Sequence, residues 1–237
     1  MARRRVKVLD TTLRDGEQTP GVALAPKRKL EIARALDLLG VDVIEAGAAI
    51  TSEGERQAIK MISDAGLRAE ICGFARAVRE DIDATLACGV DSVHLVVPTS
   101  NIHLKHKLKK SRREVKRMAL GIARYALNHD LIVEFSAEDA TRTDPAFLLE
   151  LLSGAVEEGV QRVCVCDTVG VLTPERAKEL FTNLAETINV PIAAHCHNDF
   201  GMATANTLAA VQGGAQEVHV TVNGLGERGG NAALEEV

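Results

Sequence analysis

Short runs rich in valine and isoleucine alternate with longer amphipathic stretches along most of the chain. Such runs are typical of strands buried on both faces in a parallel sheet. Between them, apolar residues recur at spacings of three and four, as in residues 27–36, and this spacing predicts helices. The predicted strands are 6–10, 41–46, 67–74, 91–97, 131–136, 161–167, 191–196 and 216–222.

Residues typical of helix ends flank several of the predicted helices. Ser52 with Glu55 three residues later is typical of a capping box, and Thr173 before Pro174 is typical of a helix start. Glycines follow the last apolar residue of several helices, where a left-handed conformation is common. These glycines are Gly40, Gly66, Gly89, Gly159 and Gly214.

The spacing of the strands predicts the fold. Seven strand-to-strand steps of roughly 30 residues each match the size of a βαβ unit. Eight such units predict a (β/α)₈ TIM barrel, with a doubly wound open sheet as the alternative. No linker divides the chain, so residues 1–237 are expected to form one barrel domain whose last residues begin the eighth helix.

Composition narrows the class of protein. Hydrophobic residues make up 46% and charged residues 26%, and no apolar run approaches the ~18 residues of a membrane span. The net charge of -5 and the 3% aromatic content argue against nucleic-acid binding. Five cysteines and a basic N-terminus without the apolar core of a secretory signal favour the cytoplasm.

Polar residues gather where the predicted strands end, and in a TIM barrel the catalytic groups lie at that face. His195 and His197 lie two apart on a strand, so both imidazoles point the same way and can reach one metal ion. Asp15, after the first strand, is our choice for a carboxylate that completes the site. The competing interpretation is one buried, hydrogen-bonded histidine and one exposed histidine.

Three other patterns are interpreted as structural. Residues 224–229 match the G-x-G-x-x-G dinucleotide pattern, but they follow the last strand, and we interpret them as a loop that shapes the pocket. Cys164 and Cys166 fit small apolar positions on a buried strand better than a redox or thiolate metal site. The basic stretch 103–113 fits a solvated loop better than a binding site for a coenzyme phosphate.

Long motifs give the chain a family resemblance. Residues 10–21, 195–201 and 222–232 resemble three signatures of the 2-isopropylmalate, citramalate and homocitrate synthases. Residues 93–100 and 164–170 look most like the archaeal-type citramalate and isopropylmalate branch. The resemblance implies a metal-dependent TIM barrel that condenses acetyl-CoA with a 2-oxo acid, in branched-chain amino acid biosynthesis (leucine or isoleucine).

The resemblance also implies roles for particular residues. A divalent ion (Mg²⁺, Mn²⁺ or Zn²⁺) would be held by Asp15, His195 and His197, with Asn231 in or near its shell. Arg14 would contact the oxo group, and Glu138 would serve as the base, or orient it, at the acetyl methyl group. The expected substrate contacts are Thr168 for the carboxylate and His94 and Ser136 for the rest of the pocket.

The resemblance leaves alternatives open. Acyl-CoA lyases and oxo-acid aldolases share this barrel, but the lyase pattern has a cysteine in the glycine loop, and residues 224–231 contain none. Family members continue past the barrel into a region that supplies further catalytic residues, often across a dimer, and nothing here corresponds to it. We therefore expect a homodimer whose C-terminal accessory region is absent, or else a barrel that binds metal and 2-oxo acid without catalysis.

Overall fold

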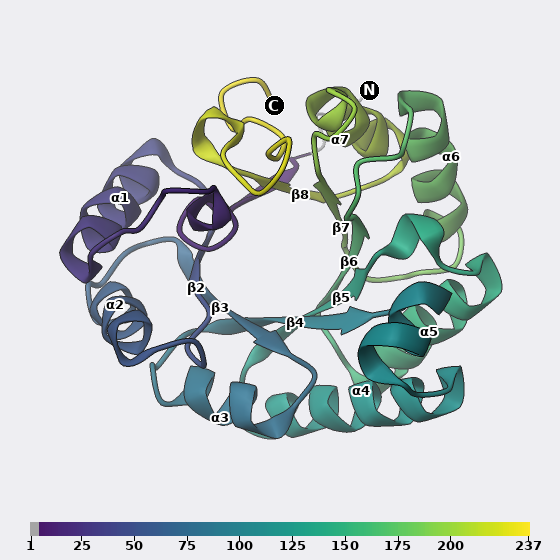
Figure 1. Ribbon diagram of the computed structural model, residues 1–237, viewed down its shortest axis with the longest axis horizontal. Helices are drawn as coiled ribbons and strands as arrows, with labels where there is room; N and C mark the ends of the chain where they lie inside the picture. Colours follow the sequence, from purple (N-terminus) through teal and green to yellow (C-terminus); the bar gives the residue numbers. More distant parts are fainter. Residues whose placement is uncertain (1–4) are drawn as a thin grey trace.

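The chain folds into a closed barrel. The structure is a computed structural model that describes residues 5–237, and within this range eight parallel strands pair in chain order from β1 to β8 (Figure 1). The strands are β1 (Lys7–Asp10), β2 (Val43–Gly47), β3 (Glu70–Arg76), β4 (Ser92–Pro98), β5 (Ile132–Glu138), β6 (Arg162–Asp167), β7 (Ile192–Cys196) and β8 (Glu217–Val220). All eight predicted strands are confirmed, as is the TIM-barrel class.

Seven α-helices surround the barrel within the described range, one after each strand from β1 to β7 (Figure 1). They are α1 (Pro26–Leu39), α2 (Glu53–Ser63), α3 (Arg79–Leu86), α4 (Arg112–Leu127), α5 (Pro145–Glu158), α6 (Pro174–Ala185) and α7 (Ala203–Gly213). No helix of the described residues has the length and apolar character needed to cross a membrane.

Some helix ends follow the sequence signals, whereas Gly66 and Gly89 lie beyond the C-caps of α2 and α3, which are Asp64 and Ala87. Gly40 and Gly159 end α1 and α5 in the left-handed conformation, and Pro174 begins α6. The Ser52 hydroxyl accepts a hydrogen bond from the Glu55 amide, but the Glu55 carboxylate accepts hydrogen bonds from Lys29 instead of returning to Ser52. A complete capping box forms elsewhere, between Ser111 and Glu114 at the start of α4.

The two faces of each strand differ in chemistry, because neighbouring side chains point in opposite directions. On β5, Val133, Phe135 and Ala137 join the main apolar cluster with the helices. Glu134 and Ser136 alternate with them and are fully buried on the opposite, interior face of the barrel. The main apolar core therefore lies between strands and helices, whereas the barrel interior combines charged and polar side chains with small apolar clusters, such as that of Leu9, Val43 and Cys72.

The predicted eighth helix is wrong for the described residues. After β8, a short 3₁₀ turn (Val222–Gly224) contains Asn223 and Gly224 with positive φ, which breaks any regular helix. The chain then folds back along β8, since the Thr221 amide donates to Ala232 O and the Leu234 amide donates to Thr221 O. These last residues cover part of the outer face of β8 (Figure 1).

The first and last strands close the barrel. β1 pairs with β8 from Lys7 opposite Glu217 to Asp10 opposite Val220. Beyond the strands, the Thr11 amide donates to Val220 O and the Val222 amide donates to Thr12 Oγ1. The loop after β1 is therefore held against the strand ends of the last quarter of the chain.

Candidate active site

Three residues from opposite ends of the chain meet at the carboxyl end of the barrel. Asp15 lies in the turn after β1, His195 lies on β7, and His197 lies just beyond it. Asp15 Oδ2 is 3.3 Å from His195 Nε2 and 3.7 Å from His197 Nε2. The two Nε2 atoms are 3.2 Å apart. All three side chains are buried, so the structure brings together the three residues predicted to ligate a metal.

The charges of this group suit a metal centre. Burial opposes ionisation of Asp15, but the Arg14 guanidinium is the main influence against it and holds the pKa of Asp15 well below its usual range. Burial lowers the pKa of His195, and burial together with His195 lowers the pKa of His197 to about 4. At neutral pH, the group therefore presents a carboxylate and two neutral imidazoles, the protonation states in which these groups ligate metals.

The spacing also fits one ion. Ligand atoms that bind a divalent ion at ~2.0–2.2 Å, about 90–110° apart, lie roughly 3–3.6 Å from one another. The three measured separations, 3.2–3.7 Å, are close to this range. Asp15 Oδ2 is buried and has no hydrogen-bond partner among residues 5–237. Buried polar atoms nearly always have a partner, and a bound ion would be one for this oxygen.

Glu45 connects the predicted substrate residues beside this group. It lies on β2, is fully buried, and accepts hydrogen bonds from Arg14 Nε at 2.8 Å and from the Thr11 hydroxyl. Its other oxygen is 2.6 Å from His94 Nδ1, and His94 Nε2 hydrogen bonds with Ser136 Oγ. The Arg14 guanidinium outweighs burial and lowers the pKa of Glu45 well below its usual range. Arg14, His94 and Ser136 therefore have fixed orientations.

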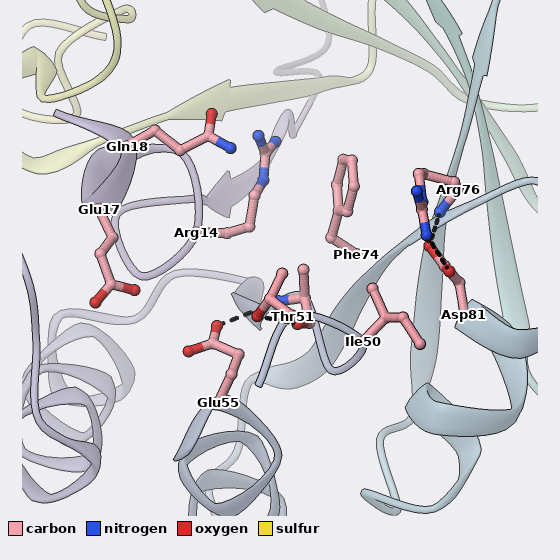
Figure 2. Close-up of a pocket in the computed structure, with 10 residues that line it drawn as sticks. Arg14, Glu17, Gln18, Ile50, Thr51, Glu55, Phe74, Arg76 and Asp81 are labelled. Atoms are coloured by element: carbon pink, nitrogen blue, oxygen red, sulfur yellow. Dashed lines mark hydrogen bonds and ion pairs between the residues drawn. The ribbon is translucent and has the colours of Figure 1, made fainter. Parts of the chain in front are cut away.

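Arg14 is held on a second side by an aromatic ring. Its guanidinium carbon is 4.7 Å from the centroid of the Phe74 ring, within cation–π range, and Figure 2 shows the two side chains next to each other. Arg14 Nη1 lies 3.3 Å from Asp15 Oδ1. The positive charge therefore lies beside the metal-ligand group and faces the pocket.

A cavity of about 480 Å³ opens onto this group. Seven of the nine predicted site residues line it, namely Arg14, Asp15, His94, Glu138, Thr168, His195 and His197. A neighbouring hollow of about 500 Å³ shares Arg14 and Phe74 with it (Figure 2). Ser136 and Asn231 are outside the lining, although Ser136 reaches the pocket through its contact with His94.

Glu138 and Thr168 line the cavity from the ends of β5 and β6. The Glu138 carboxylate binds Lys107 Nζ at 2.7 and 2.9 Å. Lys107 belongs to the stretch interpreted as a solvated loop, and it instead lines the pocket while half of its side chain stays exposed. Thr168 Oγ1 accepts a hydrogen bond from the Asp139 amide, so its own hydroxyl proton is free to donate.

Asn231 and the glycine loop pack against the metal-ligand group. Asn231 forms an isolated backbone bridge with His197, and its Nδ2 donates to Leu225 O at 3.0 Å. A Cβ atom on Gly226 would lie 2.2 Å from Asn231 Nδ2. This glycine therefore makes room for Asn231, and no helix follows the loop within the described residues, unlike the dinucleotide pattern.

Sequence reasoning missed several residues of this region. The sequence motifs assigned no role to Glu45 or Phe74. Glu134, Arg162, Glu217 and His219 are buried in the barrel interior and were also missed. Their signal was a charged residue at alternate positions of strands whose other positions are apolar.

Comparisons with known proteins agree with this geometry. The family model described as HMGL-like matches residues 5–237. The "(R)-citramalate synthase CimA" of Methanocaldococcus jannaschii is 65% identical over 232 residues, covering 98% of this chain and 47% of that protein. The "2-isopropylmalate synthase" of the same organism is 57% identical, covering 98% of this chain and 45% of that protein. The chain thus spans about half the length of these relatives.

Solved structures share the fold at low sequence identity. The HMG-CoA lyase of Bacillus subtilis superposes with a TM-score of 0.86 at 19% identity, covering 99% of this chain and 84% of that one. The hydroxymethylglutaryl-CoA lyase of Pseudomonas aeruginosa gives a TM-score of 0.85 at 21% identity, covering 98% and 83%. These similarities show a shared barrel architecture.

Proposed function

Because the chain belongs to the HMGL-like family, we propose that it is the barrel of a metal-dependent synthase that condenses acetyl-CoA with a 2-oxo acid. The observation that carries the proposal is the group of Asp15, His195 and His197 beside the fixed guanidinium of Arg14, in one cavity. The names of the two Methanocaldococcus jannaschii relatives favour pyruvate or 2-oxoisovalerate as the 2-oxo acid.

The metal-ligand group and Arg14 have different roles toward the 2-oxo acid. Asp15, His195 and His197 would hold a divalent ion, with Asn231 packed beside His197, and such an ion acts as a Lewis acid toward a carbonyl oxygen. Arg14 places a positive charge where negative charge develops on the oxo group as the new carbon–carbon bond forms. Because Glu45 and Phe74 hold the Arg14 side chain in place, the guanidinium group needs little reorganisation during this step.

The remaining predicted residues fit substrate binding. The free hydroxyl proton of Thr168 can donate to the substrate carboxylate, and His94 lines the cavity with Ser136 behind it. Apolar side chains of Val96, Leu108 and Met118 also line the cavity and would contact the alkyl group of the 2-oxo acid. A difference of one or two methylene groups there discriminates by ~1–3 kcal/mol, which suits a choice between pyruvate and 2-oxoisovalerate.

Glu138 is the proposed base, or base-orienting group, for the acetyl methyl proton. It lines the same cavity as Arg14, and its carboxylate pairs with Lys107 Nζ. The Glu138→Gln variant should lose exchange of the acetyl-CoA methyl protons with solvent, followed by NMR in D₂O. Exchange at the wild-type rate would remove Glu138 from this role.

The deciding experiment measures release of free CoA thiol from acetyl-CoA. Pyruvate, 2-oxoisovalerate and 2-oxoglutarate would be tested with Mg²⁺, Mn²⁺ and Zn²⁺. Both this chain and a longer chain that carries the rest of a full-length relative would be used. We expect metal-dependent release with at least one 2-oxo acid, and loss of that release in Asp15→Asn.

Other outcomes would overturn the proposal. Metal-dependent binding of a 2-oxo acid by calorimetry, without thiol release from either chain, would favour a barrel that binds without catalysis. Cleavage of 3-hydroxy-3-methylglutaryl-CoA in place of condensation would favour a lyase. The absence of cysteine from residues 224–231 argues against the lyase, whose pattern places one in this loop.

A further inference from the structure

A single arginine joins three loops at the carboxyl end of the barrel. Arg228 lies in the glycine loop after β8, and its Nε donates to Asp199 Oδ1 at 2.8 Å. Its Nη2 donates to Asp199 Oδ2 at 3.2 Å and to the main-chain oxygen of Thr168 at 2.5 Å. Asp199 follows β7, two residues after His197, and Thr168 comes directly after β6. One guanidinium therefore connects the loops that follow β6, β7 and β8.

We propose that Arg228 is a positioning residue for the 2-oxo acid, and that it acts through Thr168, the expected contact of the substrate carboxylate. This inference rests on the proposed function and extends it to a residue outside the cavity lining. Arg228 acts on the substrate indirectly, because it holds the Thr168 hydroxyl in a fixed place.

The backbone at Arg228 suits glycine better than arginine. Its φ is +52°, in the left-handed region that side chains rarely adopt. A residue keeps such a conformation where the surrounding structure determines it, and positions of this kind cluster at functional sites. The hydrogen bonds of the guanidinium to Asp199 and Thr168 provide that determination. The contacts of the side chain therefore explain an arginine at this position.

The three loops also pack closely, so a displacement of one would move the others. A Cβ atom on Gly229 would lie 2.6 Å from Asn198 O, and one on Gly170 would lie 2.8 Å from His197 O. These two glycines let the main chains approach one another. Arg228 adds a side-chain link between the same loops, so its loss would loosen the contacts on both sides of His197.

Thr168 is held from two sides. Arg228 binds its main-chain oxygen, and the Asp139 amide donates to its Oγ1 at 2.8 Å. Because that oxygen accepts from Asp139, the hydroxyl proton is left for a carboxylate in the cavity, which Thr168 lines. Loss of Arg228 would remove a charge-assisted hydrogen bond from the Thr168 carbonyl, and the backbone that carries the hydroxyl could then shift.

The first test measures binding of pyruvate and of 2-oxoisovalerate by calorimetry, with Mn²⁺ present and without acetyl-CoA. We expect Arg228→Gln to raise the Kd of the 2-oxo acid about tenfold, because misplacement of a contact by about 1 Å has effects of this order or larger. The Kd of Mn²⁺ alone should stay within about twofold of wild type, as for an independent site. Wild-type affinity for the 2-oxo acid in Arg228→Gln would overturn the proposal.

Arg124→Gln is the matched control. Arg124 pairs with Glu158 through the same two nitrogens, Nε and Nη2, but between α4 and α5 on the outside of the barrel. Its loss should leave both Kd values unchanged. An equal loss of 2-oxo acid binding in Arg124→Gln and Arg228→Gln would show a general effect on the fold and would overturn the positioning role.

A second variant separates position from charge. Arg228 Nη1 also lies 2.7 Å from Glu227 Oε1, and Glu227 lines the cavity, so Arg228→Gln changes the charge there as well. Arg228→Lys keeps the charge but lacks the planar fork that reaches Asp199 and Thr168 together. We expect Arg228→Lys to raise the Kd of the 2-oxo acid about threefold, between wild type and Arg228→Gln. Wild-type affinity in Arg228→Lys would assign the effect to charge alone and would overturn the positioning role.

A double-mutant cycle tests the route through Thr168. In a Thr168→Ala background, the further substitution Arg228→Gln should weaken binding of the 2-oxo acid by less than about twofold, because residues that act through one another are not additive. The full loss in that background would overturn the route through Thr168.

Binding and turnover distinguish this inference from the proposed function. A wild-type chain that binds the 2-oxo acid with the expected dependence on Arg228, but releases no thiol from acetyl-CoA, would refute the condensation alone. Thiol release by the wild type, together with unchanged binding in Arg228→Gln, would refute the positioning role alone. Circular dichroism would establish that each variant is folded, and Arg228→Lys keeps the test decisive if Arg228→Gln is not.

Discussion

At the scale of single residues, Glu45 determines the arrangement of the pocket. One buried carboxylate orients Arg14 through Nε and His94 through Nδ1, and it also accepts from the Thr11 hydroxyl. None of these bonds involves the metal-ligand group directly. Glu45 therefore acts through the orientation of Arg14 and His94. A substitution of Glu45 can thus separate the catalytic function of the pocket from its metal binding.

We predict that Glu45→Gln lowers kcat of the proposed condensation by about 10–100-fold, as loss of an orienting partner does. Metal affinity, measured by calorimetry, should stay within a few-fold of wild type, because Asp15, His195 and His197 keep their positions. Glu31→Gln, on the exposed face of α1, is the control and should change neither quantity. Unchanged kcat in Glu45→Gln would contradict the positioning role.

Asp10 gives a second prediction at this scale. Burial, aided by the charge of Glu45 and only partly offset by hydrogen bonds from Thr12, raises the pKa of Asp10 from 3.8 to about 6. The native state therefore binds this proton more tightly than the unfolded state, and stability declines as pH rises from about 4 to 6.

The Asp10→Asn variant lacks this ionisable group, so its stability should not show that decline. Its free energy of unfolding, relative to wild type, should increase between pH 4 and pH 7 by up to about 3 kcal/mol, at ~1.4 kcal/mol per pKa unit. Urea unfolding at several pH values measures this difference. A difference that stays constant across the range would show that the pKa of Asp10 is not raised in the native state.

At the scale of elements, the strands were predictable because their apolar runs are short and regularly spaced. Every predicted strand lies within a few residues of its observed position. The capping box predicted at Ser52 does not form completely, because Lys29, distant in sequence, binds the Glu55 carboxylate. The eighth helix failed for a similar reason: Leu234 and Ala232 pair with Thr221 of the preceding strand.

Lys29 also shows how one buried charge connects three elements. Its side chain lies on α1 and is fully buried, and its ammonium group binds Glu55 of α2, Glu17 of the loop after β1, and Leu13 O. Lys29 thus fixes the loop that carries Arg14 and Asp15 to helices α1 and α2. Loss of the ammonium would leave two carboxylates facing each other.

We predict that Lys29→Met destabilises the fold by about 3 kcal/mol, as breaking a buried ion pair does. Thermal and urea unfolding would measure the change. Lys60→Met is the matched control on α2, because its pair with Asp64 is exposed and contributes under ~1 kcal/mol. Equal effects of the two substitutions would contradict the role of Lys29.

At the scale of the whole molecule, a charged network spans the barrel interior. Arg162 on β6 binds Glu70 of β3 and Glu134 of β5, and Glu217 of β8 lies 3.5 Å away. The sequence alone could not reveal this network. Alternation shows that one face of a strand is polar, but it does not show that polar faces of distant strands meet, and the apolar runs suggested strands buried among apolar residues on both sides.

We predict that Arg162→Met destabilises the chain by about 3–5 kcal/mol, because it leaves buried carboxylates without their cation. Chemical unfolding measures this change. Arg124→Met removes an exposed pair with Glu158 and should cost under ~1 kcal/mol. A loss of similar size in both variants would argue that the interior network does not contribute to stability.

The pairing of β1 with β8 places the first strand beside the last, about two hundred positions later in the chain. At synthesis rates of about 5–20 residues per second, β1 waits about 10–40 s for its second neighbour. Contacts so distant in sequence also form slowly during refolding. Asp15 follows β1 and His195 lies on β7, one strand beyond the seam, so an ion bound by both would link the two ends of the chain and stabilise the closed barrel.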